Sequence, residues 1–373
     1  MRTILFLIQK EFIQVFRNRT MLPIIFVLPL VQLIILVNAA TLEMKSIEMF
    51  VVDNDLSTTS RQLIGKFKGS PFFNIVNQSS SVKEGERMIK EDKTDIAIVI
   101  PRNFEQDLIR EDKAKIQLLI NAINGTTAGI TDAYANSIIR DFNKNIIYEK
   151  LKIAPKTQLI KNININFSYW YNPQLNYKIF MVPGILVILV TIIGMFLTGL
   201  NIVREKEMGT IEQINVTPIK KYQFITGKLI PFWIIALFDL AFGLTLGKLL
   251  FNIPIVGSIP LLFGVAAVYL LVVLGLGLFL STISETQQQM LFIAFFFVLV
   301  FVLMSGIFTA TESMPQWAQK INLINPIYYF MRLIRMILLK GSSFSDITKE
   351  FFTLLIYGFS VLSLAVWRYR KTN

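Results

Sequence analysis

Long apolar runs alternate with polar segments along this chain. Six runs reach the length of about 20 residues that a helix needs to cross a membrane. They cover residues 21–40, 179–202, 224–250, 259–282, 290–309 and 351–367. The pattern predicts a mostly α-helical membrane protein with six transmembrane helices, and an even number of spans places both chain ends on one side.

Basic residues indicate which side that is. They precede the first span, lie between the second and third, and follow the sixth in the tail 368–373. Because cytoplasmic segments carry an excess of Lys and Arg, both termini are predicted to be cytoplasmic. Segment 310–350 is an exception, since it is basic although the span count places it outside.

Residues 1–20 have their own pattern. Ile4, Ile8 and Phe12 recur at helical spacing, opposite Lys10 and Arg17. This predicts a helix lying in the cytoplasmic interface, with a continuation of the first span as the alternative. The first apolar run is long and no small-x-small cleavage site follows it, so we expect a retained span and not a signal peptide.

Residues 41–177 are polar and long enough for a separate domain, which the span count places outside the cytoplasm. Short apolar runs predict strands, and the stretches between them predict helices. The expected strands cover 47–52, 72–76, 96–100 and 116–120, and the expected helices cover 57–67, 82–90, 104–109 and 128–148. Their alternation predicts a small α/β domain between the first and second spans. Asp53 and Asp55 are interpreted as helix-start caps, with metal ligands as the alternative.

Segment 310–350 mixes Pro, Trp and Tyr with Leu and Ile, which favours short interfacial helices over a span. Such helices would cap the outer mouth of the protein. Trp317, Tyr328 and Tyr329 have a second interpretation as an aromatic belt.

The amino-acid composition excludes several kinds of catalytic site and cross-link. The 373 residues are 53% apolar and include no Cys and no His, so thiolate catalysis, imidazole catalysis and disulfides are excluded. We see no catalytic or metal-binding cluster of carboxylates. The net charge of +12 is explained by basic residues that lie beside anionic lipid headgroups, and not by binding to nucleic acid.

No nucleotide-binding loop is found. The stretch from Gly243 to Lys248 has one residue too few between its glycines and lacks the following Ser or Thr. It also lies in a span, where Gly243 and Gly247 favour close helix packing and Lys248 reaches toward the interface. Active transport would therefore draw energy from a partner or from an ion gradient.

Three further residues in the spans are candidates for a substrate path or for packing. Gly275 and Gly277 favour close helix approach. Asp239 is an acidic residue deep in a span, where a carboxylate is costly and often functional. Structural hydrogen bonding and a role in transport stay open for Asp239.

The densest charged cluster lies in the segment 203–223, between the second and third spans. It reads Arg-Glu-Lys-Glu-Met-Gly-Thr-Ile-Glu-Gln from residue 204 to residue 213. Gly209 supplies a break, Thr210 a capping hydroxyl, and Pro218 a stop. The segment is either a solvated loop or a short rigid helix on which a partner protein pushes.

The order of one span, a large outer domain and five further spans resembles the ABC-2 type permeases of ABC transporters, in the exporter subgroup with a large first outer domain. The resemblance runs over nearly the whole chain. It is carried by residues 204–213, Val216-Thr217-Pro218-Ile219, Gly227-Lys228-Leu229, Leu274-Gly275-Leu276-Gly277, Thr286-Gln287-Gln288-Gln289, Asn325-Pro326 and Val51-Val52-Asp53-Asn54-Asp55.

The resemblance implies a fold like that of type V ABC exporters, in a bacterial inner membrane. Two permease chains, as a homodimer or a heterodimer, would bind two cytosolic ATPase subunits that hold ATP and Mg²⁺, so that this chain binds no cofactor and is not itself an enzyme. The segment 203–223 would be the coupling helix. Its residues expected to serve ATPase coupling are Arg204, Glu205, Lys206, Glu207, Gly209, Thr210, Glu212, Thr217 and Pro218.

The expected cargo is a hydrophobic or amphiphilic molecule, drug-like or lipid-like, with polysaccharide export as an alternative within the same architecture. A gradient-driven secondary transporter, and an intramembrane enzyme or receptor, are the rival classes. The outer domain would gate release of the cargo or dock a periplasmic adaptor protein.

Overall fold

The computed structural model describes residues 2–19, 21–39, 46–153, 170–173, 176–215 and 217–369, with the backbone alone for 148–153, 212, 214 and 215. Contacts divide the chain into two units. The membrane unit comprises the N-terminal part of the chain up to Thr41 and the C-terminal part from Phe167 onward. The α/β unit comprises Leu42–Asn166. Each is described by itself.

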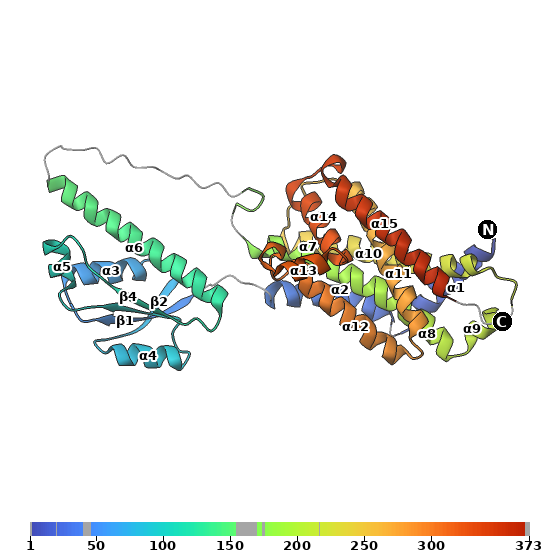
Figure 1. Ribbon diagram of the computed structural model, residues 1–373, viewed down its shortest axis with the longest axis horizontal. Helices are drawn as coiled ribbons and strands as arrows, with labels where there is room; N and C mark the ends of the chain where they lie inside the picture. The colour runs from blue at the N-terminus through green and yellow to red at the C-terminus, as the bar shows by residue number, and fades with distance from the viewer. Residues whose placement is uncertain are drawn as a thin grey trace. The chain divides into compact units, whose positions relative to one another are not determined.

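Helices joined by short loops make up the described part of the membrane unit (Figure 1). Its elements are α1 (Arg2–Arg17), α2 (Met21–Ala39), α7 (Tyr177–Ile192), the π-helical turn η1 (Ile193–Leu197), α8 (Thr198–Glu207), α9 (Thr210–Asn215), α10 (Lys221–Phe251), α11 (Ile259–Ile283), α12 (Gln287–Met304), the 3₁₀ turn η2 (Thr311–Ser313), α13 (Gln316–Asn322), α14 (Pro326–Lys340) and α15 (Phe344–Arg368). Six helices in the described residues are long and apolar enough to cross a membrane, which confirms the expected number of spans.

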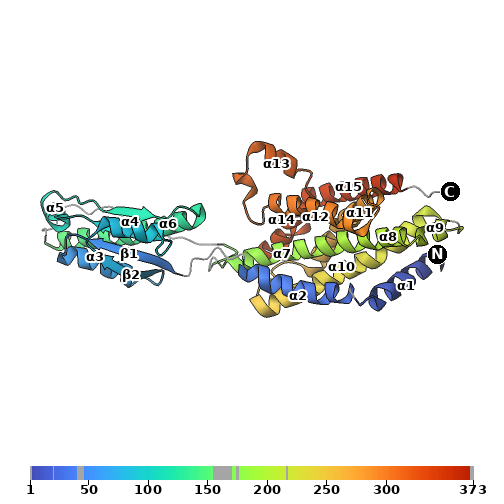
Figure 2. The same cartoon turned by 90° about the horizontal axis from the view of Figure 1, so that it is seen from below.

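One continuous helical rod forms the centre of this unit. It joins α7, η1 and α8 from Tyr177 to Glu207, and it is buried along most of its length. The rod packs against α2, α10, α11 and α14 (Figure 2). Its central position explains why residues 181–191 are apolar or small on every side, with no polar stripe.

Short polar signals set where these helices begin and end. The Ser258 hydroxyl accepts from the Leu261 amide at 3.4 Å, and the Thr286 hydroxyl accepts from the Gln289 amide at 3.2 Å. The Asn325 side chain accepts from the Ile327 amide at 3.0 Å, with Pro326 in the first turn. These caps satisfy amides that have no partner inside the helix, and they separate consecutive helices.

Helix α14, in segment 310–350, is not among the six helices long and apolar enough to cross a membrane. It buries one face against α7, α11 and α15. Phe330 lies deep in this contact, because its ring stacks on the ring of buried Tyr269 with the two ring centroids 4.2 Å apart. The apolar residues of α14 recur at helical spacing, so the same pattern that suits an interface also suits a buried face.

The α/β unit contains a four-stranded sheet in the order β2-β1-β3-β4. Its strands are β1 (Ile47–Asp53), β2 (Phe73–Ser79), β3 (Ile96–Ile100) and β4 (Gln117–Ile120), and its helices are α3 (Thr58–Lys68), α4 (Val82–Lys90), α5 (Phe104–Arg110) and α6 (Gly125–Ile153). Strand β1 pairs in parallel with β2 and β3, while β4 is antiparallel to β3. The expected α/β alternation is confirmed, in chain order between α2 and α7.

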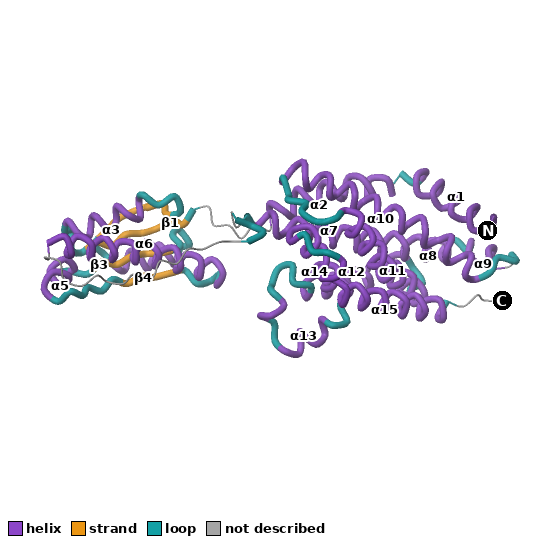
Figure 3. Tube along the Cα trace, turned by 90° about the horizontal axis from the view of Figure 1, so that it is seen from above, coloured by secondary structure: helices purple, strands orange, loops and turns teal. Residues whose placement is uncertain are grey.

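Helices cover both faces of this sheet, with α3 and α6 on one side and α4 on the other (Figure 1). Figure 3 shows the face covered by α3 and α6. Met49 and Val51 pack on the side of α3, α5 and α6, while Phe50 and Val52 pack on the side of α4. A strand covered on both sides needs apolar residues at successive positions, which is the pattern of β1.

Asp53 holds the turn before α3 and does not cap that helix, whose N-cap is Ser57. Its Oδ1 accepts from the amides of Asp55 and Leu56 at 3.0 Å, and its Oδ2 accepts from the Ser60 hydroxyl at 2.8 Å. Asp55 in turn accepts from the Glu105 amide at 3.1 Å. Within the described ranges, no group of three acidic side chains is arranged to hold a metal ion.

Candidate coupling site

The membrane unit has two ends. We call one the α9 end, where α1, α9 and the last turns of α15 lie, and the other the α13 end (Figure 2). Residues of the predicted coupling segment lie at the α9 end, so this end is built up first.

The segment 203–223 is not one helix. Its first residues are the last turn of α8, which continues the central rod to Glu207. Gly209 then adopts a positive φ of 70°, a conformation that favours glycine, and α9 starts at Thr210. The Thr210 hydroxyl donates to the Glu205 carbonyl at 3.1 Å and holds the turn. The segment therefore forms a bent tip on a span, followed by an irregular stretch before α10.

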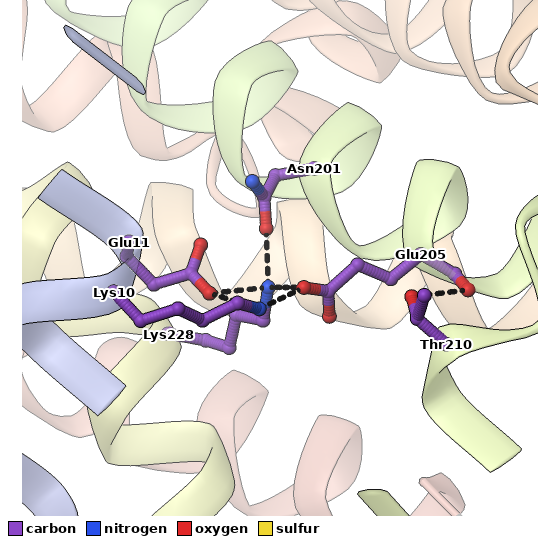
Figure 4. A network of polar contacts seen from close by, with 6 residues as sticks. All are labelled: Lys10, Glu11, Asn201, Glu205, Thr210 and Lys228. Atoms are coloured by element: carbon purple, nitrogen blue, oxygen red, sulfur yellow. Dashed lines mark hydrogen bonds and ion pairs between the residues drawn. The ribbon is translucent and has the colours of Figure 1, made fainter. Parts of the chain in front are cut away.

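A buried charge cluster lies directly behind this tip (Figure 4). Lys228 Nζ of α10 is 2.7 Å from Glu11 Oε1 of α1 and 2.7 Å from Glu205 Oε1 of α8. It also donates to Asn201 Oδ1 at 2.7 Å. The three charged side chains are 1–3% exposed. A single ammonium group on α10 thus joins three helices, of which α1 is distant in sequence from the other two.

Lys10 completes the cluster from its more exposed edge. Its Nζ is 3.0 Å from Glu11 Oε1 and also pairs with Glu205. Burial alone would lower the pKa of Lys10, but hydrogen bonds and charges from Glu205 and Glu11 outweigh it and raise the pKa. With Lys228, two positive charges balance two negative ones.

Balanced charges of this kind hold helices together only while every partner is present. Removing one partner of a buried pair costs about 3–5 kcal/mol, because the remaining charge loses its compensation away from water. Glu11 Oε2, Glu205 Oε2 and Asn201 Nδ2 have no hydrogen-bond partner among the described residues. The cluster therefore relies on the two lysines.

The tip is also tied to the turn between α11 and α12. Lys206 Nζ donates to the Ser284 carbonyl at 2.9 Å. Glu207 accepts from the Gln287 amide at 2.7 Å and from the Gln287 side chain. These contacts place the polar turn 284–289 beside the Arg204 cluster.

The predicted coupling residues divide into an inner and an outer group. Glu205 was expected to serve ATPase coupling, but its side chain is buried in the charge cluster. Lys206, Glu207 and Pro218 are exposed, whereas Arg204, Gly209, Thr210 and Thr217 are partly buried. The side chain of Glu212 lies outside the described residues. The role of each residue in ATPase coupling stays a prediction.

Sequence reasoning missed two members of the cluster. Lys228 was overlooked as a charge within a span, and Glu11 was overlooked as the lone acidic residue of the first 20. Both are charges at positions where the apolar pattern expects none. That signal identifies an unusual residue, but not its partner on another helix.

The three candidates deeper in the spans fall into two kinds. A Cβ on Gly277 would lie 2.7 Å from the Met195 carbonyl of η1, and one on Gly275 would lie 3.1 Å from Val361 of α15. Both glycines therefore leave room for a neighbouring helix to approach closely. Asp239 is buried in α10, and neither of its carboxylate oxygens has a hydrogen-bond partner in the part of the chain that the structure describes.

Comparison with known proteins decides the family. The family model for ABC-2 family transporter proteins matches residues 19–367, which is nearly the whole chain. This chain belongs to the ABC-2 transporter family. It is the membrane subunit of an ABC exporter and a multi-pass membrane protein.

Individual relatives agree with this assignment. The chain is 30% identical to the probable multidrug ABC transporter permease YbhR of Escherichia coli, over 98% of this chain and 97% of that protein. It is 28% identical to the inner membrane transport permease YhhJ of the same organism, over 86% and 84% of the two chains. The ABC transporter G family member 20 of Dictyostelium discoideum is 22% identical, and the match covers 89% of this chain but 46% of that protein.

Proposed function

We propose that the α8–α9 tip of this permease receives the movement of a separate ATPase subunit and passes it to the spans. One observation carries the proposal: Glu205, next to the tip, is locked to α1 and α10 through the buried charge cluster. A force on the tip would therefore act on several helices together, as rigid-body coupling requires.

The surface available to the ATPase is the outer face of the tip. Lys206, Glu207 and Met208 are exposed there, with Met208 as an apolar side chain that is 52% exposed. Charged residues around an exposed apolar centre are common at protein interfaces. ATP and Mg²⁺ would bind to the ATPase subunit, and this chain would supply no catalytic group.

The remaining parts of the proposal concern assembly and cargo. Two permease chains would form the transport unit, as a homodimer or with a similar permease, in the bacterial inner membrane with both termini cytoplasmic. The α/β unit would lie outside the cytoplasm, where it gates release or docks an adaptor protein. The relatives named multidrug permeases support a hydrophobic or amphiphilic cargo.

The charge reversal Glu207→Lys tests the tip. It replaces the acceptor for Gln287 with a cation and inverts the charge of the exposed surface. We expect ATPase binding to weaken about tenfold or more, since like charges across an interface cost several kcal/mol. Binding is measured by titrating the purified ATPase onto the permease in nanodiscs, and ATP-driven transport is measured in proteoliposomes.

Glu312→Lys provides the matched control, because it makes the same charge change at an exposed residue of η2. It should leave ATPase binding unchanged. Wild-type ATPase binding by a well-folded Glu207→Lys variant would contradict the proposal. Proteoliposomes driven by an ion gradient without ATP should show no transport, and transport there would favour the secondary-transporter alternative.

A further inference from the structure

An arginine at the α13 end is held in place on two sides and unpaired on the third. The guanidinium Cζ of Arg335, in α14, lies 3.7 Å from the ring centroid of Phe180 in α7. Its Nη1 donates to the carbonyl of Gly306, just after α12, at 3.1 Å. The ring contact and this hydrogen bond fix the plane of the guanidinium among three segments.

The unpaired edge of the Arg335 guanidinium is suited to binding an anion. Nε and Nη2 of Arg335 are buried and have no hydrogen-bond partner among the described residues. These two nitrogens direct their N–H groups along one edge of the guanidinium, in the geometry that binds both oxygens of a carboxylate or phosphate. Buried donors without acceptors are costly, which favours an acceptor supplied from elsewhere.

The acidic residues near this end have other partners or are exposed. Glu350 Oε1 pairs with Arg332 at 3.4 Å, and Asp346 accepts from the Ser343 amide at 2.8 Å in the first turn of α15. Glu312 is an exposed residue of η2. None of the ion pairs in the described residues includes Arg335.

The two helices that carry Phe180 and Arg335 also carry the cations Lys178 and Lys340. Lys178 Nζ lies 5.8 Å from the centroid of the Phe251 ring, and Lys340 Nζ lies 5.9 Å from that of Tyr171. Both lysines lean on aromatic faces and have no carboxylate partner in the described chain. The first turn of α7 carries Lys178, so the positive end of that helix dipole contributes as well. An anion approaching this end is attracted before it reaches Arg335.

We propose that the Nε–Nη2 edge of Arg335 binds the carboxylate or phosphate group of an anionic ligand at the α13 end of the membrane unit. An anionic lipid headgroup and a free anion share this chemistry. The site lies away from the α8–α9 tip and is independent of the function proposed for that tip. It would also give a role to Arg335, one of the basic residues that segment 310–350 carries against the charge rule.

The test uses the full chain, purified and delipidated in detergent, with paired probes. Oleate is compared with oleyl alcohol, and phosphatidylglycerol with diacylglycerol of the same chains, by native mass spectrometry. We expect each anionic probe to bind about tenfold or more tightly than its neutral partner, as charge-assisted bidentate hydrogen bonds predict. Arg335→Lys keeps the charge but loses the fork, so it should remove most of this preference.

Arg332→Lys is the matched control, since Arg332 is exposed and already paired with Glu350; it should keep the full preference. Equal binding of anionic and neutral probes by the wild type, or an undiminished preference in Arg335→Lys, would overturn the proposal. Inorganic phosphate separates the sources. Displacement of phosphatidylglycerol by phosphate indicates that the anion alone suffices, and its failure to displace indicates a lipid ligand.

A second measurement on the wild type covers the case in which Arg335→Lys does not fold. Hydrogen exchange in the peptides around Phe180 and Arg335 should slow when oleate is added and not when oleyl alcohol is added. The same protection with both probes, or with neither, would count against the site.

Discussion

Replacing Lys228 with Met is expected to destabilise the permease by about 3–5 kcal/mol and to release α1 from the spans. The substitution leaves Glu11 and Glu205 buried, with Lys10 as the remaining cation of the cluster. The methionine is similar in size, so the loss comes from uncompensated charge and not from a cavity. Unfolding in mixed micelles would measure the loss of stability.

The release of α1 has its own readout. The chain contains no Cys, so one introduced thiol reports without background. Leu7 of α1 packs against α10 so closely that a Cβ on Gly227 would lie 2.7 Å from the Leu7 Cβ. A cysteine at position 7 should label slowly in the otherwise wild-type chain and faster with Lys228→Met.

Two comparisons isolate the charge effect. Lys220→Met removes an exposed lysine just before α10 and should change neither stability nor labelling. Exchanging the charges, with Lys228→Glu and Glu205→Lys together, should recover part of the stability lost in either single variant. Unchanged unfolding and slow labelling in Lys228→Met would show that the cluster does not hold α1.

The sequence predicted the elements better than their contacts. Apolar runs are enough to locate a span, since a helix in lipid needs only length and apolar side chains. Short apolar runs between helical stretches also located the four strands. The signal is clearest for β1 and β3, because both faces of these strands are covered and successive residues are apolar. These are local properties of the chain.

The charge cluster could not be predicted in the same way. Its members come from α1, α8 and α10, and only packing brings Glu11, Glu205 and Lys228 to one point. A charged residue in a span indicates an unfavourable free energy of burial. The ion pair that offsets it depends on how the helices pack, which the sequence does not show. The inward orientation of Glu205 follows from that pairing, which the resemblance to ABC-2 permeases did not indicate.

Neighbouring residues of the tip make contacts with different parts of the membrane unit. Glu207 and Lys206 connect the tip to the turn before α12, while Glu205 connects it to α1 and α10. Alternate faces of one helical turn therefore make separate contacts. A partner that displaces the tip would shift both sets of contacts, which is how a small local movement could reach most of the spans.

Close packing around η1 supplies the other large expected effect. Gly277→Ala places a methyl group 2.7 Å from the Met195 carbonyl, in the π-helical turn of the central rod. Backbone cannot move aside as a flexible side chain can, so α11 and the rod must separate. We expect a loss of about 1–3 kcal/mol, the usual cost of overpacking, together with a loss of transport.

Gly264→Ala is the matched control, because it lies in the same helix with no heavy atom within 4 Å of the added Cβ. It should stabilise the chain by up to about 1 kcal/mol through helix propensity alone. Both variants gain the same propensity, so the difference between their unfolding free energies measures the contact with η1. Equal stability of the two would mean that the rod and α11 separate without cost, and the close approach would then not be what fixes η1 in place.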